Sequence, residues 1–173
     1  MHGPMADEAH FNRVMSYIEL GKQSGQPLIG GSRKGEKGFW IEPTIFLNPD
    51  KESRVYKEEI FGPVLSIITF KTEEEAIELA NDTNTGLSGT LLYFPIFCLA
   101  SDIRTRKAAL YTSDLNRALR VSAKIETGNV SINAPHFPNT QVPFGGFKES
   151  GDGKELGKYG LQSFLQTKSI LIK

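Results

Sequence analysis

Residues 63–80 read PVLSIITFKTEEEAIELA and hold the clearest strand–helix pair of the chain. The branched and aromatic residues from Pro63 to Phe70 are typical of a buried strand. Thr72 and Glu75 have the spacing of a capping box, in which two side chains satisfy each other's exposed backbone donors at the start of a helix. The stretch therefore predicts one strand followed by one helix.

Similar units lie on both sides of this pair. The upstream segment predicts an amphipathic helix that Gly21 and Gly25 close, because its apolar residues recur every three or four positions: Phe11, Val14, Met15 and Ile18. A strand is predicted from Phe39 to Phe46, where Pro43 indicates an edge or an irregular ladder.

Downstream, Ala109 to Thr112 reads as a short strand and Ser113 as the cap of the next helix. That helix is expected to end at Gly128 and to present four apolar positions: Leu115, Ala118, Leu119 and Ile125. Asn129 to Asn133 predicts another strand. Alternating strands and helices of these lengths predict an α/β fold with a largely parallel sheet.

Composition narrows the class of protein. The chain has 173 residues, of which 39% are hydrophobic, and its 20 basic and 20 acidic residues give no net charge. These values favour one soluble globular domain and argue against a nucleic-acid-binding protein. The segment from Leu91 to Ala100 is too short to cross a membrane, and Met1 to Ala9 lacks the pattern of a targeting signal. We therefore expect a cytoplasmic protein without a membrane partner.

Two segments carry candidate chemistry. In Lys57 to Pro63, adjacent carboxylates and an aromatic residue stand before a Gly-Pro turn and a buried strand. Such a carboxylate can accept two hydrogen bonds from a ribose diol, and the aromatic ring can cover a flat ring. An exposed loop with a hydrophobic anchor remains the alternative. In Pro143 to Gly151, glycines surround two aromatic residues, as a backbone that needs close approach or positive φ requires.

Other motifs are weak. The glycines from Gly151 to Gly157 have the wrong spacing for a dinucleotide fingerprint, so we expect a turn before a short helix. Cys98 lies among apolar residues and is expected to be a small buried hydrophobe rather than a nucleophile. The three histidines are too scattered for metal ligands, and no metal site is predicted.

The chain holds a series of ordered blocks: GFWIEPT (38–44), EEIFGP (58–63), NDT (81–83) with GL (86–87), DLNRA (114–118), GNVSIN (128–133) and PFGGFK (143–148) with SG (150–151). In their order and co-occurrence these blocks resemble the aldehyde dehydrogenase superfamily. The resemblance covers nearly the whole chain but only the C-terminal third of a family member.

The resemblance implies oxidation of an aldehyde to its acid with NAD or NADP as the hydride acceptor. It implies that Glu59 binds the nicotinamide ribose, that Phe61 lies near the nicotinamide, and that Phe144 and Phe137 line the aldehyde pocket. It also implies that residues 163–173, chiefly Phe164 to Ile172, form an oligomerisation strand that joins copies of the chain. From the residues alone, pairing of this strand within its own fold is the alternative.

Residues 1–162 are thus expected to form part of the catalytic domain. The family's nucleophilic cysteine, general-base glutamate and oxyanion asparagine have no counterpart among the 173 residues. We therefore expect the isolated chain to be inactive towards aldehydes. A non-catalytic module that binds other subunits and an artefact of the gene model are the alternatives.

Gly89 to Lys107 interrupts the resemblance. These residues are aromatic-rich and then basic, and they match neither neighbour. We interpret them as an insert of 19 residues, either a retained intron or an insertion of the lineage.

Overall fold

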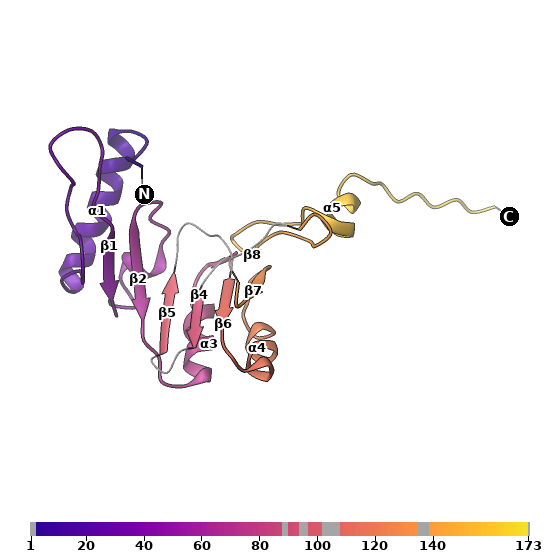
Figure 1. Cartoon of the computed structure of the whole chain (residues 1–173). Coiled ribbons are helices and arrows are strands. Elements are labelled where there is room, and N and C mark those ends of the chain that lie inside the picture. Colours follow the sequence, from indigo (N-terminus) through magenta and orange to yellow (C-terminus); the bar gives the residue numbers. More distant parts are fainter. Residues whose placement is uncertain (1–2, 88–89, 94–96, 102–107, 135–138, 173) are drawn as a thin grey trace.

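The structure is a computed structural model that describes residues 3–87, 90–93, 97–101, 108–134 and 139–172. Its main sheet has the strand order β1-β2-β5-β4-β6-β7 (Figure 1). The strands in this spatial order are β1 (Thr44–Leu47), β2 (Val64–Ile68), β5 (Phe97–Ser101), β4 (Thr90–Tyr93), β6 (Ala108–Tyr111) and β7 (Val130–Ile132). A smaller sheet pairs β3 (Thr85–Gly86) with β8 (Phe147–Lys148).

The pairing confirms an α/β fold whose sheet is parallel except at one strand. The pairs β1·β2, β4·β6 and β6·β7 are parallel, whereas β5 is antiparallel to both of its neighbours. The helices are α1 (Glu8–Ser24), α2 (Arg54–Lys57), α3 (Glu73–Asn81), α4 (Leu115–Ser122) and α5 (Gly157–Gln162). Figure 1 shows α1 at the β1 end of the sheet and α4 at the β7 end.

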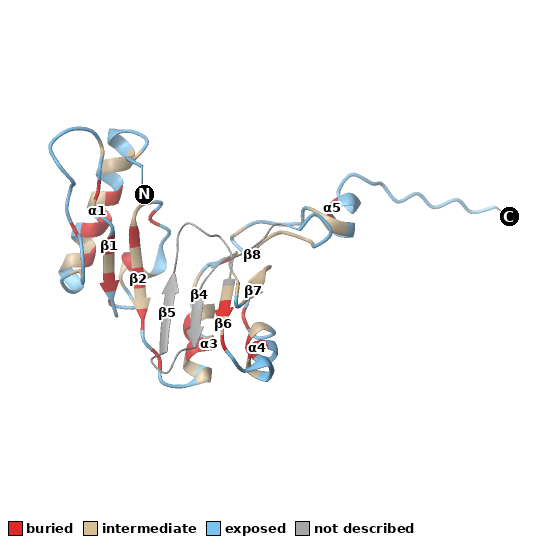
Figure 2. Ribbon diagram, viewed as in Figure 1, coloured by how far each residue is buried: buried red, intermediate tan, exposed pale blue. Residues whose placement is uncertain are grey.

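Two apolar clusters form the core, and Figure 2 shows their buried residues on the helices and strands. The first cluster joins α1 to β1, α2 and β2, with Val14 and Ile18 fully buried at its centre. The second joins α3 and α4 to β6, with Leu110 and Val121 fully buried. No helix within the described residues is long and apolar enough to span a membrane.

The predicted strand from Phe39 to Phe46 is wrong in its first half. β1 begins only at Thr44, and Ile41 makes an isolated bridge to Arg33. Pro43 has no backbone N–H and cannot donate to a ladder, which explains the late start. The following pair is close to the prediction: β2 covers Val64–Ile68, and the backbone N–H of Glu75 donates to Thr72 Oγ1 at 3.2 Å. The Glu75 carboxylate reaches the N–H of Lys71 instead of that of Thr72.

The predictions for α4 need correction at both ends. Asp114, not Ser113, caps the helix, because its carboxylate accepts from the N–H of Arg117 at 3.1 Å. The helix ends at Ser122, six residues before Gly128. Leu115 and Leu119 are exposed, and the core-facing residues are Ala118, Val121 and Ile125. Ala118 and Val121 are three residues apart on one face of α4, and Ile125 lies just after the end of the helix.

The terminal segment is not a strand in this structure. Ser163 and Phe164 form a turn that continues α5, and residues 165–172 follow as an exposed chain that runs away from the body of the molecule (Figures 1 and 2). The described part of this segment pairs with neither sheet. Pairing within its own fold, the alternative left open by the sequence, is therefore not observed among the described residues.

Candidate functional site

The two predicted site segments lie at one edge of the main sheet. Gly62 and Pro63 come directly before β2, and Gly145 of the second segment lies against Gly128, two residues before β7. β5 is antiparallel to both β2 and β4, so β2 has the same direction as β4, β6 and β7. The amino ends of these strands therefore meet at one edge, and this edge carries both segments.

The structure separates the roles of the two adjacent carboxylates at this edge. Arg54 Nε donates to Glu58 Oε1 at 2.6 Å, and the hydroxyl of Tyr17 donates to Glu58 Oε2 at 2.5 Å. These donors, Arg54 first, lower the pKa of Glu58 to about 2. The same hydrogen bond to Glu58 raises the pKa of the Arg54 guanidinium. Glu58 is therefore a structural anion that ties the segment before β2 to α1 and α2.

Glu59, the predicted ribose ligand, is exposed. No hydrogen bond or ion pair to another described residue engages its carboxylate in this structure. A carboxylate in this state keeps its acceptor sites for hydroxyl groups of a ligand. The structure thus assigns the structural role to Glu58 and leaves Glu59 able to bind.

Phe61 is held in an unusual backbone conformation. Its φ is +56°, in the left-handed region, and its side chain remains 46% exposed. His10 Nε2 lies 2.6 Å from the carbonyl oxygen of Phe61, while the N–H of Ala6 points at Nδ1 at 3.3 Å. Because Nδ1 accepts a hydrogen bond, Nε2 carries the proton and donates it to the Phe61 carbonyl. The start of α1 thus fixes the turn that presents the aromatic ring.

Phe144 belongs to a loop that is fixed through its backbone. The N–H groups of Phe144 and Glu155 each donate to the other's carbonyl oxygen at 2.7 Å. A Cβ placed on Gly128 would lie 1.8 Å from the carbonyl oxygen of Gly145, so only glycine allows this approach. Asn129 Nδ2 also donates to that oxygen, at 2.9 Å. The predicted need for close backbone approach in 143–151 is confirmed.

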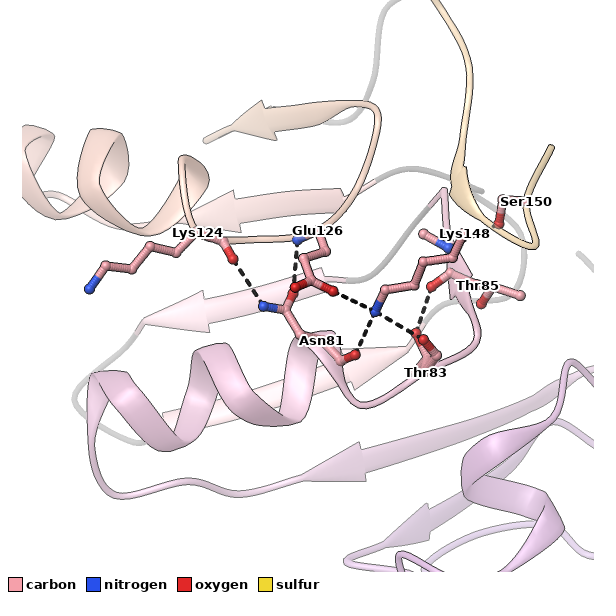
Figure 3. Close-up of polar contacts among 8 residues, drawn as sticks. Asn81, Thr83, Thr85, Lys124, Glu126, Lys148 and Ser150 are labelled. Atoms are coloured by element: carbon pink, nitrogen blue, oxygen red, sulfur yellow. Dashed lines mark hydrogen bonds and ion pairs between the residues drawn. The ribbon is translucent and has the colours of Figure 1, made fainter. Parts of the chain in front are cut away.

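A lysine network completes the anchoring of the loop (Figure 3). Lys148 Nζ donates to the carbonyl oxygens of Asn81 at 2.6 Å and Thr83 at 3.0 Å, and it pairs with Glu126 Oε2 at 2.9 Å. The Asn81 side chain bridges to the N–H of Glu126 at 2.8 Å. Sequence reasoning missed this network, because its members are far apart in the chain and no spacing links them.

A cavity of about 440 Å³ lies beside the network. Its lining residues come from the loop and from the turn before β7: Glu126, Gly146, Phe147, Lys148, Gly151, Asp152, Gly153 and Lys154. Glu59, Phe61 and Phe144 are not among these residues. Phe137 lies outside the described residues, as does the side chain of Cys98.

Comparison with known proteins decides the family. The model of the aldehyde dehydrogenase family matches residues 1–92 and 103–170. The chain belongs to the aldehyde dehydrogenase family. Relatives of this aldehyde dehydrogenase chain include an aldehyde dehydrogenase of Davidiella tassiana, 42% identical over 99% of the chain, and retinal dehydrogenase 2 of Mus musculus, 41% identical over 99%. The chain spans 31% and 30% of these two proteins, which is about a third of their length.

Solved structures of the family agree with the fold. The NAD-dependent aldehyde dehydrogenase of Sinorhizobium meliloti matches with a TM-score of 0.80 and 39% identity, over 96% of this chain and 30% of that one. Betaine aldehyde dehydrogenase of Staphylococcus aureus, solved with NAD+, matches with a TM-score of 0.79 and 37% identity over the same shares. The aldehyde dehydrogenase match is interrupted at residues 93–102, inside the predicted insert of residues 89–107.

Proposed function

We propose that the chain is the C-terminal part of an NAD(P)-dependent aldehyde dehydrogenase. In this proposal Glu59 accepts hydrogen bonds from the nicotinamide ribose, and Phe61 packs near the nicotinamide. Phe144, with Phe137, lines the aldehyde pocket. The observation that carries the proposal is family membership together with the exposed carboxylate of Glu59 at the amino end of β2.

The residues present fit the cofactor. The exposed Glu59 carboxylate offers two oxygens to a vicinal diol, and the half-exposed ring of Phe61 offers an apolar surface to a flat ring. When bound, NAD(P)+ supplies the hydride acceptor for oxidation of the aldehyde. The task of this chain is to hold the ribose and to place the two aromatic rings, and Glu58, Arg54 and His10 keep the cofactor-side segment in position.

We further propose that the isolated 173-residue polypeptide does not oxidise aldehydes, because it lacks counterparts of the family's cysteine nucleophile and general-base glutamate. A chimera tests both statements. Residues 1–173 would replace the matching C-terminal segment of the Sinorhizobium meliloti enzyme, in one version intact and in a second version without residues 89–107.

Aldehyde-dependent formation of NADH measures the outcome. The isolated chain is expected to give none, and the chimera without residues 89–107 is expected to be active. A chimera that folds but stays inactive would contradict the proposal that the chain is the C-terminal part of an active aldehyde dehydrogenase. Turnover by the isolated chain would show that the nucleophile has a counterpart within the 173 residues.

A second candidate function is a subunit-interaction module. The end of the chain exposes large apolar side chains: Phe164 at 87%, Leu165 at 63%, Ile170 at 73%, Leu171 at 98% and Ile172 at 92%. A run of large apolar side chains that are this exposed favours a surface that a second chain covers. We propose that Phe164 to Ile172 adds as a strand to a sheet of a second copy. Sedimentation of the full chain and of a version ending at Ser163 tests this, since only the full chain should self-associate.

A further inference from the structure

A hairpin formed by β4 and β5 lies in the middle of the main sheet. Its strands pair in antiparallel register from Thr90↔Ala100 to Tyr93↔Phe97. On one side β5 pairs antiparallel with β2, and on the other side β4 pairs parallel with β6. The space between the facing edges of β2 and β6, here termed the slot, is filled by this hairpin (Figure 1).

The two sides of the slot are placed as in full-length aldehyde dehydrogenases. The match to the Sinorhizobium meliloti enzyme covers 96% of this chain with a TM-score of 0.80, so it includes the elements on both sides of the hairpin. β2 and β6 therefore lie as far apart in that enzyme as they do here. Two strands separate them in this chain, which sets the width of the slot at three strand spacings, about 14 Å.

The β4–β5 hairpin is not what fills the slot in the family. The family model matches residues 1–92 and 103–170, so β5 has no counterpart in it. An empty slot is excluded as well, because the facing edges of β2 and β6 would then present rows of unpaired backbone N–H and C=O groups. Strands from another part of the chain must fill the slot in the full-length enzymes. This chain spans only 30% of the Sinorhizobium meliloti enzyme, so these strands come from the remainder of that enzyme.

Contacts outside the hairpin link the two sides of the slot. One apolar cluster contains Ile68 of β2, Leu110 of β6 and Leu79 of α3. Arg120 of α4 donates two hydrogen bonds to the carboxylate of Glu73 in α3, at 2.6 and 2.7 Å. The helices α3 and α4 thus connect β2 to β6 without help from the hairpin. A strand that enters the slot meets two hydrogen-bonding edges and an apolar layer that are already in place.

We propose that the slot is a docking site for strands from the upstream part of an aldehyde dehydrogenase chain, and that the β4–β5 hairpin occupies it in their place. With the hairpin, the 173-residue chain completes its own sheet and is closed to the upstream part. Without residues 89–107, the slot is open to the addition of strands. The identity of the partner rests on the proposed function, which takes the chain as a C-terminal part; the occupation of the slot by the hairpin does not.

Capture of a co-expressed partner tests the docking site. The partner is the part of the Sinorhizobium meliloti enzyme upstream of the match, produced in the same cells as a tagged copy of this chain. The chain without residues 89–107 is expected to retain about ten times as much partner as the intact chain, or more. A matched control replaces residues 89–107 with 19 Gly and Ser residues, which keep the length but form a flexible coil. This control should capture the partner as well as the deletion does.

Amide hydrogen exchange of the intact chain alone tests the occupation of the slot. Both hairpin strands are paired on both sides, so the amides of β4 and β5 should exchange far more slowly than those of the exposed residues 165–172. Fast exchange in both hairpin strands would overturn the proposal.

Three outcomes of the capture experiment would also overturn it. These are capture by the intact chain at the level of the deletion or above, capture by neither, and capture by the deletion but not by the Gly and Ser control. Neither readout depends on activity. An inactive chimera would refute the proposed function alone, whereas the capture and exchange experiments decide the slot.

Discussion

The two site segments, one carrying Glu59 and the other Phe144, are held by different means. On the side of α1, β1 and β2, large side chains such as Ile18 and Phe46 interlock in a buried cluster, and the exposed Glu59 lies on a turn tied by an ion pair. On the side of β6 and β7, the loop of Phe144 is held by hydrogen bonds and by glycines that allow backbone to touch backbone. The Glu59 segment should therefore depend most on the volume of the side chains packed beneath it, and the Phe144 loop most on the space between its backbone and that of Gly128.

Loss of volume gives the largest expected effect. Ile18 is fully buried in the first cluster, so Ile18→Ala should lower the free energy of unfolding by about 2–5 kcal/mol. Urea denaturation followed by circular dichroism measures it. Leu28→Ala, at a side chain that is 62% exposed, is the control and should stay within about 0.5 kcal/mol.

Added volume should damage the other side. A methyl group on Gly128 would clash with the carbonyl oxygen of Gly145. Gly128→Ala should therefore lower the free energy of unfolding by about 2–3 kcal/mol, at the upper end for an overpacked site. Faster amide exchange in residues 143–148 should accompany the loss. Gly3→Ala, with nothing near its added methyl group, should be neutral. Equal stability of both variants would show that the loop does not rest on this contact.

The lysine network should contribute less than either packing contact. Lys148→Met keeps most of the side-chain length but leaves the carbonyl oxygens of Asn81 and Thr83 without this donor. The free energy of unfolding should fall by about 1–2 kcal/mol. The exposed Lys158→Met keeps the change of charge the same and serves as the control. Thermal unfolding of the two variants at one salt concentration compares them, and equal midpoints would refute the role of Lys148.

The smallest effect concerns pH. The folded-state pKa of Glu58 is about 2, below its ordinary value near 4.5. The ionised Glu58 therefore stabilises the fold fully above pH 4.5, and this contribution is lost as the pH falls towards 2. The unfolding midpoint of the wild-type chain should therefore fall more steeply across this window than that of Glu58→Gln. Because the pair is partly exposed, raised salt should shrink the difference. Parallel pH curves at low salt would contradict the ion pair.

Local patterns predicted the local elements and little else. The strand and helix within residues 63–80 follow from branched residues and a capping box, and both lie close to their predicted bounds. The start of β1 and the exposed face of α4 depend on partners that are distant in sequence, so periodicity could not determine them. The segment from Phe164 to Ile172 has strand composition, yet a strand exists only where a second strand pairs with it.

The candidate site shows the same limit. The sequence pointed to two carboxylates and to a glycine-rich loop, and both segments lie at one edge of the sheet. The residues alone could not tell Glu58 from Glu59, and only the family resemblance singled out Glu59. The structure separates them through Arg54, four residues before Glu58, and through the hydroxyl of Tyr17, which α1 brings from 41 residues away. The predicted insert was visible as a change of composition, but its place between β2 and β6 required the pairing of the strands.

The most direct test of the account is a pair of Michaelis constants in the chimera that lacks residues 89–107. Glu59→Gln is expected to raise the KM for NAD+ about tenfold or more while the KM for the aldehyde stays the same, the loss expected when a charged hydrogen-bond acceptor is neutralised. Phe144→Ala is expected to do the reverse. Equal changes of both constants in both variants, or no change in either, would contradict the assignment of the two segments to cofactor and aldehyde.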